Sequence, residues 1–389
     1  MKDVIFLNSH PIQYFAPLYK FMNEYGVKTS AWYCSDESIR GALDKQFGVD
    51  VKWDIPLLEG YNYKFFKNYS WKPSQGAGFL GLINLGVIKQ LFSSPKSVIV
   101  VHGWNYFTHL SVLLLGKILG HTICLRCEMP LNQEMLKTGL KQKLKNFGLK
   151  YLILPRVNYC LYIGTQNKNF YKYLGVKESR LIFCPYSVDN KRFTSERINL
   201  EPRKSIIKQS LGIPISDKII LYSGKYLQKK RPMDLLAAFH KVNIPNSWLI
   251  LLGEGELRNE IESYVSNNHL KNVILTGFIN QSKVSEFYSI CDVFVMCSEI
   301  GETWGLSVNE AMNFNVPIIL SDLPGSATDL IIDNDNGCIF KTGDISQLSQ
   351  KLEDVLLNNK LSKKTAPSVF LEQYSYKTIA DNLKSITIN

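Results

Sequence analysis

Short apolar segments rich in β-branched residues recur along the chain, and stretches with helical periodicity separate them. The apolar segments are continuous rather than alternating, which is typical of strands buried on both faces of a parallel sheet. The expected strands cover residues 4–7, 97–101, 122–125, 159–163, 219–222, 248–252, 273–275, 293–296, 316–320 and 338–340. Two such series predict an α/β protein with two Rossmann-like, doubly wound parallel-sheet domains.

The chain has 389 residues, enough for two domains that each bury a core. We expect an N-terminal domain over 1–200, a C-terminal domain over 201–370, and a helix within 371–389 that packs back on the first domain. The polar stretch 194–205, which contains Pro202, predicts the linker. Because open parallel sheets bind ligands at the carboxyl ends of their strands, substrates should lie in an interdomain cleft.

The charge is uneven: the formal net charge is +11, of which residues 1–200 carry +13 and residues 201–389 carry −2. A basic half indicates a polyanionic partner, which can be nucleic acid, an anionic membrane surface or a phosphorylated substrate. No nucleic-acid-binding signature is present, so nucleic acid is not expected as a partner.

Eight scattered cysteines, several in apolar runs, indicate reduced core thiols in a cytoplasmic protein. The CxxC at 124–127 has no second pair, so we expect no metal site. No apolar run is long enough for a signal peptide or a bilayer span, so any membrane contact should be peripheral.

The segment after the predicted strand 293–296 carries two carboxylates around a helix start. Gly305 permits close backbone approach, and the N–H groups of Leu306 and Ser307 would face a phosphate. Glu302 precedes this helix and Glu310 lies within it, so the two bracket a site that suits a nucleotide sugar. The alternative is that both glutamates only favour the helix start and its exposed face.

Cations follow the predicted strand 219–222. Gly224, Lys225 and Lys230 stand in a Gly-Lys…Lys-Arg-Pro loop before a helical pattern at 233–241. Such a loop suits a diphosphate, because Lys and Arg donate charge-assisted hydrogen bonds to phosphoryl oxygens. A solvated charge run before a helix is the alternative.

The ordered set of motifs resembles the retaining family-four glycosyltransferases of GT-B fold. The resemblance covers 221–344 and rests on Ser-Gly-Lys…Lys-Arg-Pro, Leu-Gly-Glu-Gly, Thr-Gly-Phe-Ile, Cys-Asp-Val-Phe-Val, Glu-Thr-Trp-Gly…Asn-Glu-Ala-Met, Val-Pro-Ile-Ile and Asp-Asn-Gly-Cys. Its Glu-x7-Glu signature is Glu302…Glu310. The segment 185–193 also looks like the family's stretch before its second domain.

The resemblance implies a nucleotide-diphosphate sugar donor and catalysis without a metal or other cofactor. Lys225 and Lys230 would bind the diphosphate, and Glu310 would hold the ribose. Glu302 would be a catalytic residue and, with the backbone at Gly305, Leu306 and Ser307, would hold the donor sugar and phosphate. The base would lie near Phe278 and Ile279.

The N-terminal half fits the family less closely, and we expect it to bind the acceptor. Its first loop contains His10 and Gln13, and a His-Pro-Ile-Gln-Tyr start resembles a subset of the family. Where many members place a histidine after a strand, this chain has Arg126 and Glu128, which would organise the reacting sugar or the acceptor hydroxyl. The alternative is a strand-end ion pair. His102, after another strand, is a further catalytic candidate, with a structural role as its alternative.

The densest basic segment, 137–156, has Leu136, Leu140, Leu144, Phe147 and Tyr151 at spacings of four, four, three and four. This predicts a helix with one apolar stripe. Such a helix either lies on an anionic membrane surface or packs its stripe into the core with a solvated cationic face. The candidate membrane contacts are Lys137, Lys141, Lys143, Lys145 and Lys150.

Together these features predict a retaining glycosyltransferase that transfers a sugar from a nucleotide sugar to a glycan or lipid-linked glycan acceptor. The implied setting is bacterial surface polysaccharide biosynthesis, of O-antigen, lipopolysaccharide or capsule type, in the cytoplasm or peripherally on the inner face of the cell membrane. Two alternatives remain: a catalytically silent GT-B binding module at the membrane, and a sugar-nucleotide epimerase.

Overall fold

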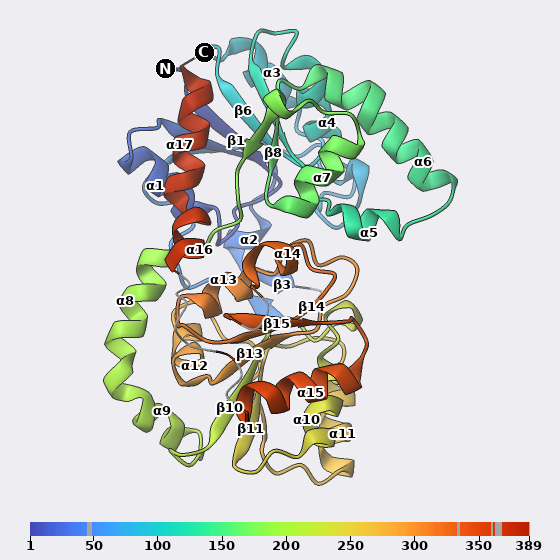
Figure 1. The fold of residues 1–389 in the computed structure, drawn as a ribbon. Coiled ribbons are helices and arrows are strands. Elements are labelled where there is room, and N and C mark those ends of the chain that lie inside the picture. The colour runs from blue at the N-terminus through green and yellow to red at the C-terminus, as the bar shows by residue number, and fades with distance from the viewer. Residues whose placement is uncertain (45–48, 333–334, 359–360, 362–367, 389) are drawn as a thin grey trace. The chain divides into compact units, whose positions relative to one another are not determined.

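The computed structural model describes residues 1–44, 49–332, 335–358, 361 and 368–388, and the chain divides into two compact α/β units (Figure 1). The N-terminal unit comprises Met1–Ala42, Ile55–Tyr186 and Tyr374–Asn389. The C-terminal unit comprises Leu43–Asp54 and Ser187–Gln373. Each unit is built around its own parallel sheet.

In the N-terminal sheet the first strand of the chain lies inside the sheet, and later strands are added on both sides of it. In spatial order its strands are β5 (Asn62–Phe65), β2 (Thr29–Tyr33), β1 (Val4–Asn8), β6 (Val98–His102), β7 (Thr122–Arg126), β8 (Tyr159–Tyr162) and β9 (Leu181–Phe183). Val4 of β1 pairs in parallel register with Thr29 on one side and Val98 on the other. The strand order therefore reverses between β1 and β6, where doubly wound sheets bind ligands.

The C-terminal sheet repeats this order. Its parallel strands are β12 (Val273–Leu275), β11 (Ser247–Leu252), β10 (Lys218–Ser223), β13 (Val293–Met296), β14 (Ile318–Ser321) and β15 (Gly337–Phe340). The order reverses between β10 and β13, so the loops after these two strands occupy the ligand-binding end of the sheet. A separate ladder pairs β3 (Ala42–Asp44) with β4 (Val49–Val51).

Helices bury both faces of the N-terminal sheet. On one face Ile99 and Ile123 pack with Val87 and Leu113 of the helices in a core cluster, while Val100 on the other face is also fully buried. The helices and helical turns are α1 (Ala16–Glu24), α2 (Glu37–Arg40), η1 (Phe79–Gly81), α3 (Leu85–Ser93), α4 (Phe107–Leu115), α5 (Leu131–Met135), α6 (Leu140–Phe147), the π-helical η2 (Gly148–Ile153), η3 (Leu154–Arg156), α7 (Thr165–Tyr173), η4 (Glu178–Arg180) and α17 (Tyr376–Thr387).

The last helix, α17, belongs to the N-terminal unit. The Tyr25 hydroxyl donates to Asp381 at 2.8 Å, Asn382 donates to the Phe183 carbonyl at 2.8 Å, and Lys2 N–H donates to the Thr387 carbonyl at 3.0 Å. The two labelled chain ends accordingly lie side by side in Figure 1.

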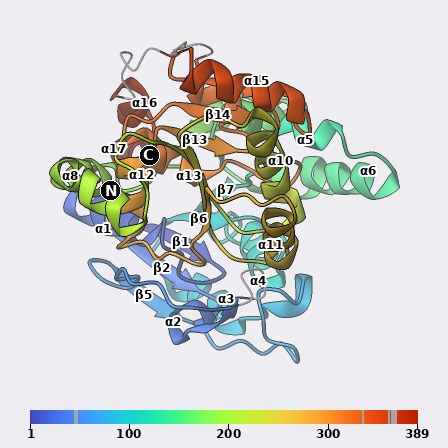
Figure 2. The same cartoon turned by 90° about the horizontal axis from the view of Figure 1, so that it is seen from below.

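The C-terminal sheet is also covered on both faces (Figure 2). Ile220 and Val295 pack with Leu236 of α10 and Leu352 of α15 in its core cluster. Its helices are α8 (Asn190–Leu200), η5 (Glu201–Arg203), α9 (Lys204–Ser210), η6 (Gln228–Lys230), α10 (Pro232–Val242), α11 (Arg258–Asn267), α12 (Val284–Ile290), α13 (Leu306–Met312), α14 (Ala327–Leu330), α15 (Ile345–Leu356) and α16 (Ser368–Gln373).

The predicted linker at 194–205 is wrong, because this segment is helical. The Asp189 carboxylate caps α8 by accepting from the Arg192 N–H at 3.0 Å, and Phe193 and Leu200 of α8 are buried. Pro202 stands in the first turn of η5, where its missing N–H costs no hydrogen bond. The chain enters the C-terminal unit at Ser187, so the boundary expected near residue 200 falls inside this helical segment.

Each described cysteine is a free thiol, and all except Cys291 are buried. Within the described residues no helix is long and apolar enough to cross a membrane, and no group of three or more His, Cys, Asp or Glu side chains is arranged to hold a metal ion.

Candidate functional site

Three glycine turns meet at the carboxyl ends of β10, β11 and β12. Gly253 N–H donates to the Gly277 carbonyl at 3.0 Å, and Gly224 N–H donates to the Leu252 carbonyl at 3.0 Å. A Cβ on Gly253, whose φ is +150°, would lie 1.9 Å from the Gly224 carbonyl oxygen. Glycine is therefore required at position 253, because only it lets the loops after β10 and β11 touch.

The basic loop after β10 ends in a left-handed residue. Arg231 has a φ of 50° and stands at the start of α10. Its guanidinium bonds Asp234 at 2.6 Å and Glu299 at 2.8 Å, and the Glu299 N–H donates to the Lys229 carbonyl at 2.8 Å. These contacts tie the loop after β10 to the loop after β13, at the point where the strand order reverses.

Lys230 and Glu302 meet at this junction. The Lys230 ammonium contacts the Glu302 carboxylate directly, and the Ser298 hydroxyl lies 3.5 Å from the same carboxylate oxygen. Burial, and then the positive charges of Lys229 and Lys225, lower the pKa of Lys230 to about 7, while the adjacent carboxylate opposes this shift. The sequence prediction assigned both residues to the donor site, and the structure brings them together.

Gly305 opens α13 as expected. Its φ is +91°, so any other residue would strain the backbone there, and a Cβ would also displace the Met296 side chain, whose sulfur lies 2.6 Å from the Cβ position. Leu306 and Ser307 form the first positions of α13.

Glu310 is only 2% exposed, which differs from the alternative of a glutamate on an exposed helix face. Its carboxylate accepts from the Tyr288 hydroxyl at 2.8 Å and from the Gln281 amide at 3.3 Å. Arg192 in turn donates to the Gln281 side-chain oxygen at 2.8 Å. Tyr288, Gln281 and Arg192 were not predicted as site residues, since their separations in sequence give no sign that they meet Glu310.

Phe278 and Ile279 follow β12, in the loop predicted to hold the base. The Phe278 ring packs edge-on against Trp53, with the centroids 5.8 Å apart. Asn280 donates to the Lys52 carbonyl at 2.7 Å, and the Asp54 carboxylate accepts from the Ser282 hydroxyl. A segment from the first sixth of the sequence is therefore fastened to the loop after β12, and no sequence motif indicated this.

In the N-terminal unit, His102 and Arg126 are paired residues at the carboxyl ends of β6 and β7. Arg126 is 2% exposed and donates to Glu128 at 3.0 Å and to the Cys184 carbonyl at 3.0 Å. Its guanidinium carbon lies 4.7 Å from the Tyr186 ring centroid and 5.4 Å from that of Phe15. Both rings are within the range of cation–π attraction.

Glu128 bridges Arg126 and Tyr186. The Tyr186 hydroxyl donates to Glu128, whose side chain is 26% exposed, whereas Arg126 is buried. Tyr186, Phe15 and Cys184 were not named as site residues. The motif at 185–193 drew attention to this segment, but only the fold shows that Tyr186 lies against Arg126.

His102 is held as a neutral imidazole. Burial, followed by the charge of Arg126, lowers the pKa of His102 well below its usual value. Its ring packs edge-on against Phe15 at 4.6 Å, and its Nε2 atom has no hydrogen-bond partner among the described residues.

His10 and Gln13 lie after β1, in the loop that also supplies Phe15. The His10 Nδ1 atom lies 2.9 Å from the Ser9 hydroxyl, and both His10 and Gln13 are partly exposed. The structure therefore places the loop of His10 and Gln13, through Phe15, beside His102 and Arg126.

The lysines predicted to contact a membrane separate into two sets. Lys137 and Lys145 pair with Glu134, which is 4% exposed, whereas Lys141, Lys143 and Lys150 are exposed. The helix α6 begins at Leu140 rather than at position 137, because Gly139, with a φ of +94°, ends the preceding turn.

Comparison with known proteins identifies the class of the C-terminal unit. Residues 203–368 match the family model described as "Glycosyl transferases group 1", so this unit carries a domain of that group. The whole chain superposes on the crystal structure of Anabaena Alr3699/HepE in complex with UDP and glucose with a TM-score of 0.72, over 99% of both chains and at 14% identity. The fold is therefore GT-B, as predicted.

Curated relatives match over part of their length. The chain is 29% identical over 200 residues to N-acetyl-alpha-D-glucosaminyl L-malate synthase of Bacillus anthracis, covering 50% of this chain and 51% of that protein. It is 22% identical over 151 residues to O-antigen chain mannosyltransferase C of Escherichia coli, covering 39% and 40%. The chain thus spans about half or less of the length of these relatives.

Proposed function

We propose that this protein is a retaining glycosyltransferase of family four, which transfers a sugar from a nucleotide-diphosphate sugar to a hydroxyl of a glycan or glycolipid acceptor. The observation that carries the proposal is the contact of Lys230 with Glu302 at the ligand-binding end of a group 1 domain. The neighbour with UDP and glucose bound shows that this fold accepts such ligands, and the similarity to an O-antigen chain mannosyltransferase favours surface polysaccharide synthesis.

In this proposal the C-terminal unit binds the donor. Lys230 and Lys225 bind the diphosphate, Glu310 orients the ribose, and Phe278 and Ile279 border the base. Glu302 holds a donor-sugar hydroxyl, beside the backbone of Gly305, Leu306 and Ser307. When donor binds, the diphosphate replaces the Glu302 carboxylate as the main partner of the Lys230 ammonium.

The reaction proceeds by attack of the acceptor hydroxyl on the same face as the departing diphosphate. The glycosidic C–O bond to the diphosphate breaks, the new C–O bond forms, and the acceptor proton passes to the leaving phosphate oxygen. Lys230 and Lys225 stabilise the charge that develops on that oxygen, so no metal or cofactor is needed. Most of the acceleration comes from positioning and from these cations.

The N-terminal unit binds the acceptor. Glu128 is a partly exposed carboxylate there, and Arg126 and Tyr186 fix its orientation. Glu128 accepts a hydrogen bond from the acceptor hydroxyl, and neutral His102, His10 and Gln13 border the acceptor.

The test is turnover of a panel of nucleotide sugars by the purified protein, with EDTA present, and analysis of the product anomer. Release of nucleoside diphosphate with retention supports the proposal, and Glu302→Gln should abolish it. Glu256→Gln, at an exposed position of the same unit, is the matched control and should behave as wild type. If no donor is consumed, or if Glu302→Gln stays fully active, the proposal fails. A free epimerised nucleotide sugar would indicate the epimerase instead.

A further inference from the structure

The outer face of α6 and the turns after it exposes a stripe of large apolar side chains. Leu140, Leu144, Phe147 and Tyr151 are 72%, 62%, 58% and 55% exposed. Their spacing of four, three and four residues places them on one side of the helix. We refer to these four residues as the α6 face.

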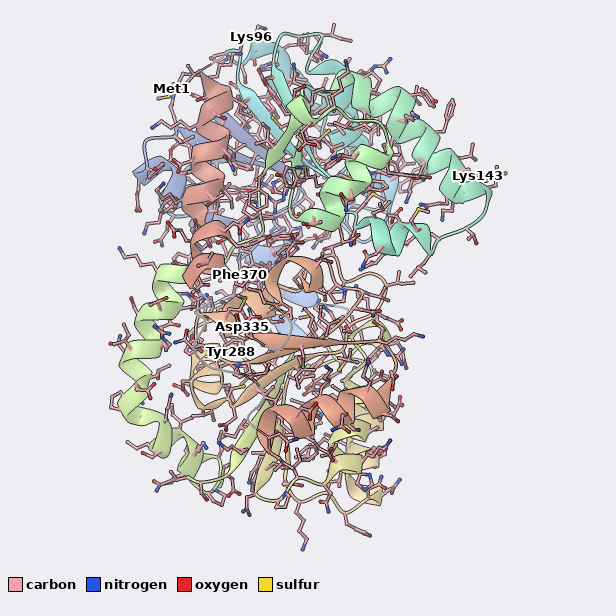
Figure 3. The ribbon with its side chains drawn as sticks, in the orientation of Figure 1. Met1, Lys96, Lys143, Tyr288, Asp335 and Phe370 are labelled. Carbon is pink, nitrogen blue, oxygen red and sulfur yellow. The ribbon has the colours of Figure 1, made fainter. Side chains whose placement is uncertain are left out.

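The α6 face points away from the core of its own unit. The opposite side of the same helical segment carries Leu149 and Ile153, which are 1% and 4% exposed and belong to the core cluster. Both cartoon views show α6 projecting from its sheet, and Lys143 lies at its outer end (Figures 1, 2 and 3). The side of the helical segment that packs into the core is thus the side opposite to the stripe. The alternative, in which the stripe itself packs into the core, is wrong. A contiguous exposed apolar stripe marks an interaction surface.

Exposed cations border this face. Lys141 lies along one side of the stripe, and Lys143 and Lys150 along the other. From residue 135 to residue 156 the sequence contains no Asp or Glu. The α6 face therefore combines apolar area with positive charge, and its own segment supplies no acidic side chain.

Glu134 forms ion pairs with the other two lysines of the predicted set, Lys137 and Lys145, and so anchors α6. It accepts from Gln142 at 2.8 Å and pairs with Lys137 at 2.6 Å and with Lys145. Lys137 and Lys145 are thus committed to the helix anchor, which removes them from the set of predicted membrane contacts.

We propose that the α6 face docks on an anionic lipid surface, with Leu140, Leu144, Phe147 and Tyr151 in the interface and Lys141, Lys143 and Lys150 at the headgroups. The charge favours this occupant over a second copy of the chain, because a symmetric contact would bring the same lysines together. Apolar insertion and attraction to anionic headgroups act together in such helices. The docking goes beyond the proposed transferase activity and does not depend on it.

The experiment is flotation of the full-length protein with vesicles of phosphatidylcholine alone or of phosphatidylcholine and phosphatidylglycerol in equal amounts. We expect binding to the anionic vesicles only, weakened by added salt. Lys141→Gln with Lys143→Gln should weaken binding about 30-fold, from the typical contribution of a lysine near an anionic surface. Leu144→Gln with Phe147→Gln should abolish it.

Two control variants match these changes elsewhere in the N-terminal unit. Phe92→Gln replaces an aromatic side chain that is 61% exposed on α3, and Lys72→Gln with Lys89→Gln removes two exposed lysines. Both should float as wild type does.

Equal binding to both vesicle types, or unchanged binding by the α6 variants, would overturn the proposal. So would a dimer in solution that the Leu144 and Phe147 changes dissociate, because a second copy would then cover the face. UDP binding by the same variants should be normal, which separates this test from that of the donor site.

Discussion

The Lys230 ammonium contacts the Glu302 carboxylate across 72 residues of sequence, where the loops after β10 and β13 meet. The pair lies at the reversal of strand order, so each side chain is delivered by a different strand end. In the proposed enzyme this contact keeps a partly buried cation paired until a diphosphate binds.

Replacing Lys230 should weaken nucleotide binding without unfolding the protein. We expect Lys230→Gln to raise the dissociation constant of UDP by about 10- to 100-fold, as expected for the loss of a hydrogen bond to a charged group. Titration calorimetry measures this directly. Lys271→Gln, which changes an exposed lysine of the same unit, should leave the affinity unchanged. Unaltered UDP affinity in Lys230→Gln would remove Lys230 from the donor site.

The affinity for UDP should depend on pH above neutrality. Because the pKa of Lys230 is lowered to about 7, binding a diphosphate at higher pH requires uptake of a proton by Lys230. We expect the affinity to fall between pH 7 and pH 9, by up to about tenfold per unit. Lys230→Arg keeps its charge throughout and should remove the fall. A wild-type affinity that is flat over this range would show that Lys230 stays charged.

The same shift predicts the opposite trend for stability. In the unfolded chain Lys230 titrates near pH 10.4, so between pH 7 and pH 10 the unfolded state binds more protons than the folded state. Burial of charged Lys230 therefore destabilises the fold below pH 7, and this penalty is relieved as the pH rises. Urea titrations should show that the stability of wild type relative to Lys230→Gln increases from pH 7 to pH 9.

Much of the fold could be predicted, because buried parallel strands need continuous apolar runs, and each predicted run contains a strand. The strands β2, β3, β4, β5 and β9 were missed. In β5, Asn62, Tyr63 and Lys64 are exposed at a sheet edge, so that strand carries no apolar run. The predicted linker is wrong because a polar composition also suits a helix on the surface: α8 buries only Phe193 and Leu200.

Residues of the candidate site could be predicted only where they belong to a sequence motif. Lys230 and Glu302 follow strands and match a family pattern, so both could be named. Arg126 ends β7, and Tyr186 follows β9. The two residues meet because both strands have their carboxyl ends at the same edge of the sheet, which the sequence alone does not indicate. Likewise, the pairing of Lys145 with Glu134 crosses the turn at Gly139, and helical spacing alone does not indicate it.

The buried carboxylate of Glu310 depends on Tyr288. Tyr288→Phe removes the donor 2.8 Å from this carboxylate and should lower the free energy of unfolding by about 1–3 kcal/mol. Urea denaturation measures the loss. If Glu310 also holds the ribose, Tyr288→Phe should weaken UDP binding while leaving the binding of inorganic pyrophosphate unchanged. If Tyr288→Phe weakens the binding of UDP and of pyrophosphate equally, the substitution disturbs the whole site rather than the contact of Glu310 with the ribose.

Glu128 should act on the acceptor rather than on the donor. Glu128→Gln keeps the shape of the side chain but removes its charge, so we expect transfer to slow by about 10- to 100-fold, the usual scale for losing a hydrogen bond to a charged group, with UDP affinity unchanged. Tyr186→Phe leaves the carboxylate in place but frees one oxygen, and its effect should be smaller and should appear mainly in the acceptor KM. A matching loss of UDP affinity in Glu128→Gln would contradict this division.

The fastening of Asp54 to Ser282 links residues 52–54 to the loop that carries Phe278 and Ile279. Asp54 accepts from the Ser282 hydroxyl, and Trp53 packs on Phe278 at 5.8 Å. Asp54→Ala should therefore loosen the loop, weakening UDP binding several-fold while leaving pyrophosphate binding intact, because only the base contacts that loop in the proposed complex. Trp53→Ala should act in the same direction, and Glu59→Ala, an exposed acid five residues after Asp54, is the control. If Asp54→Ala weakens pyrophosphate binding as much as UDP binding, the loop after β12 does not hold the base.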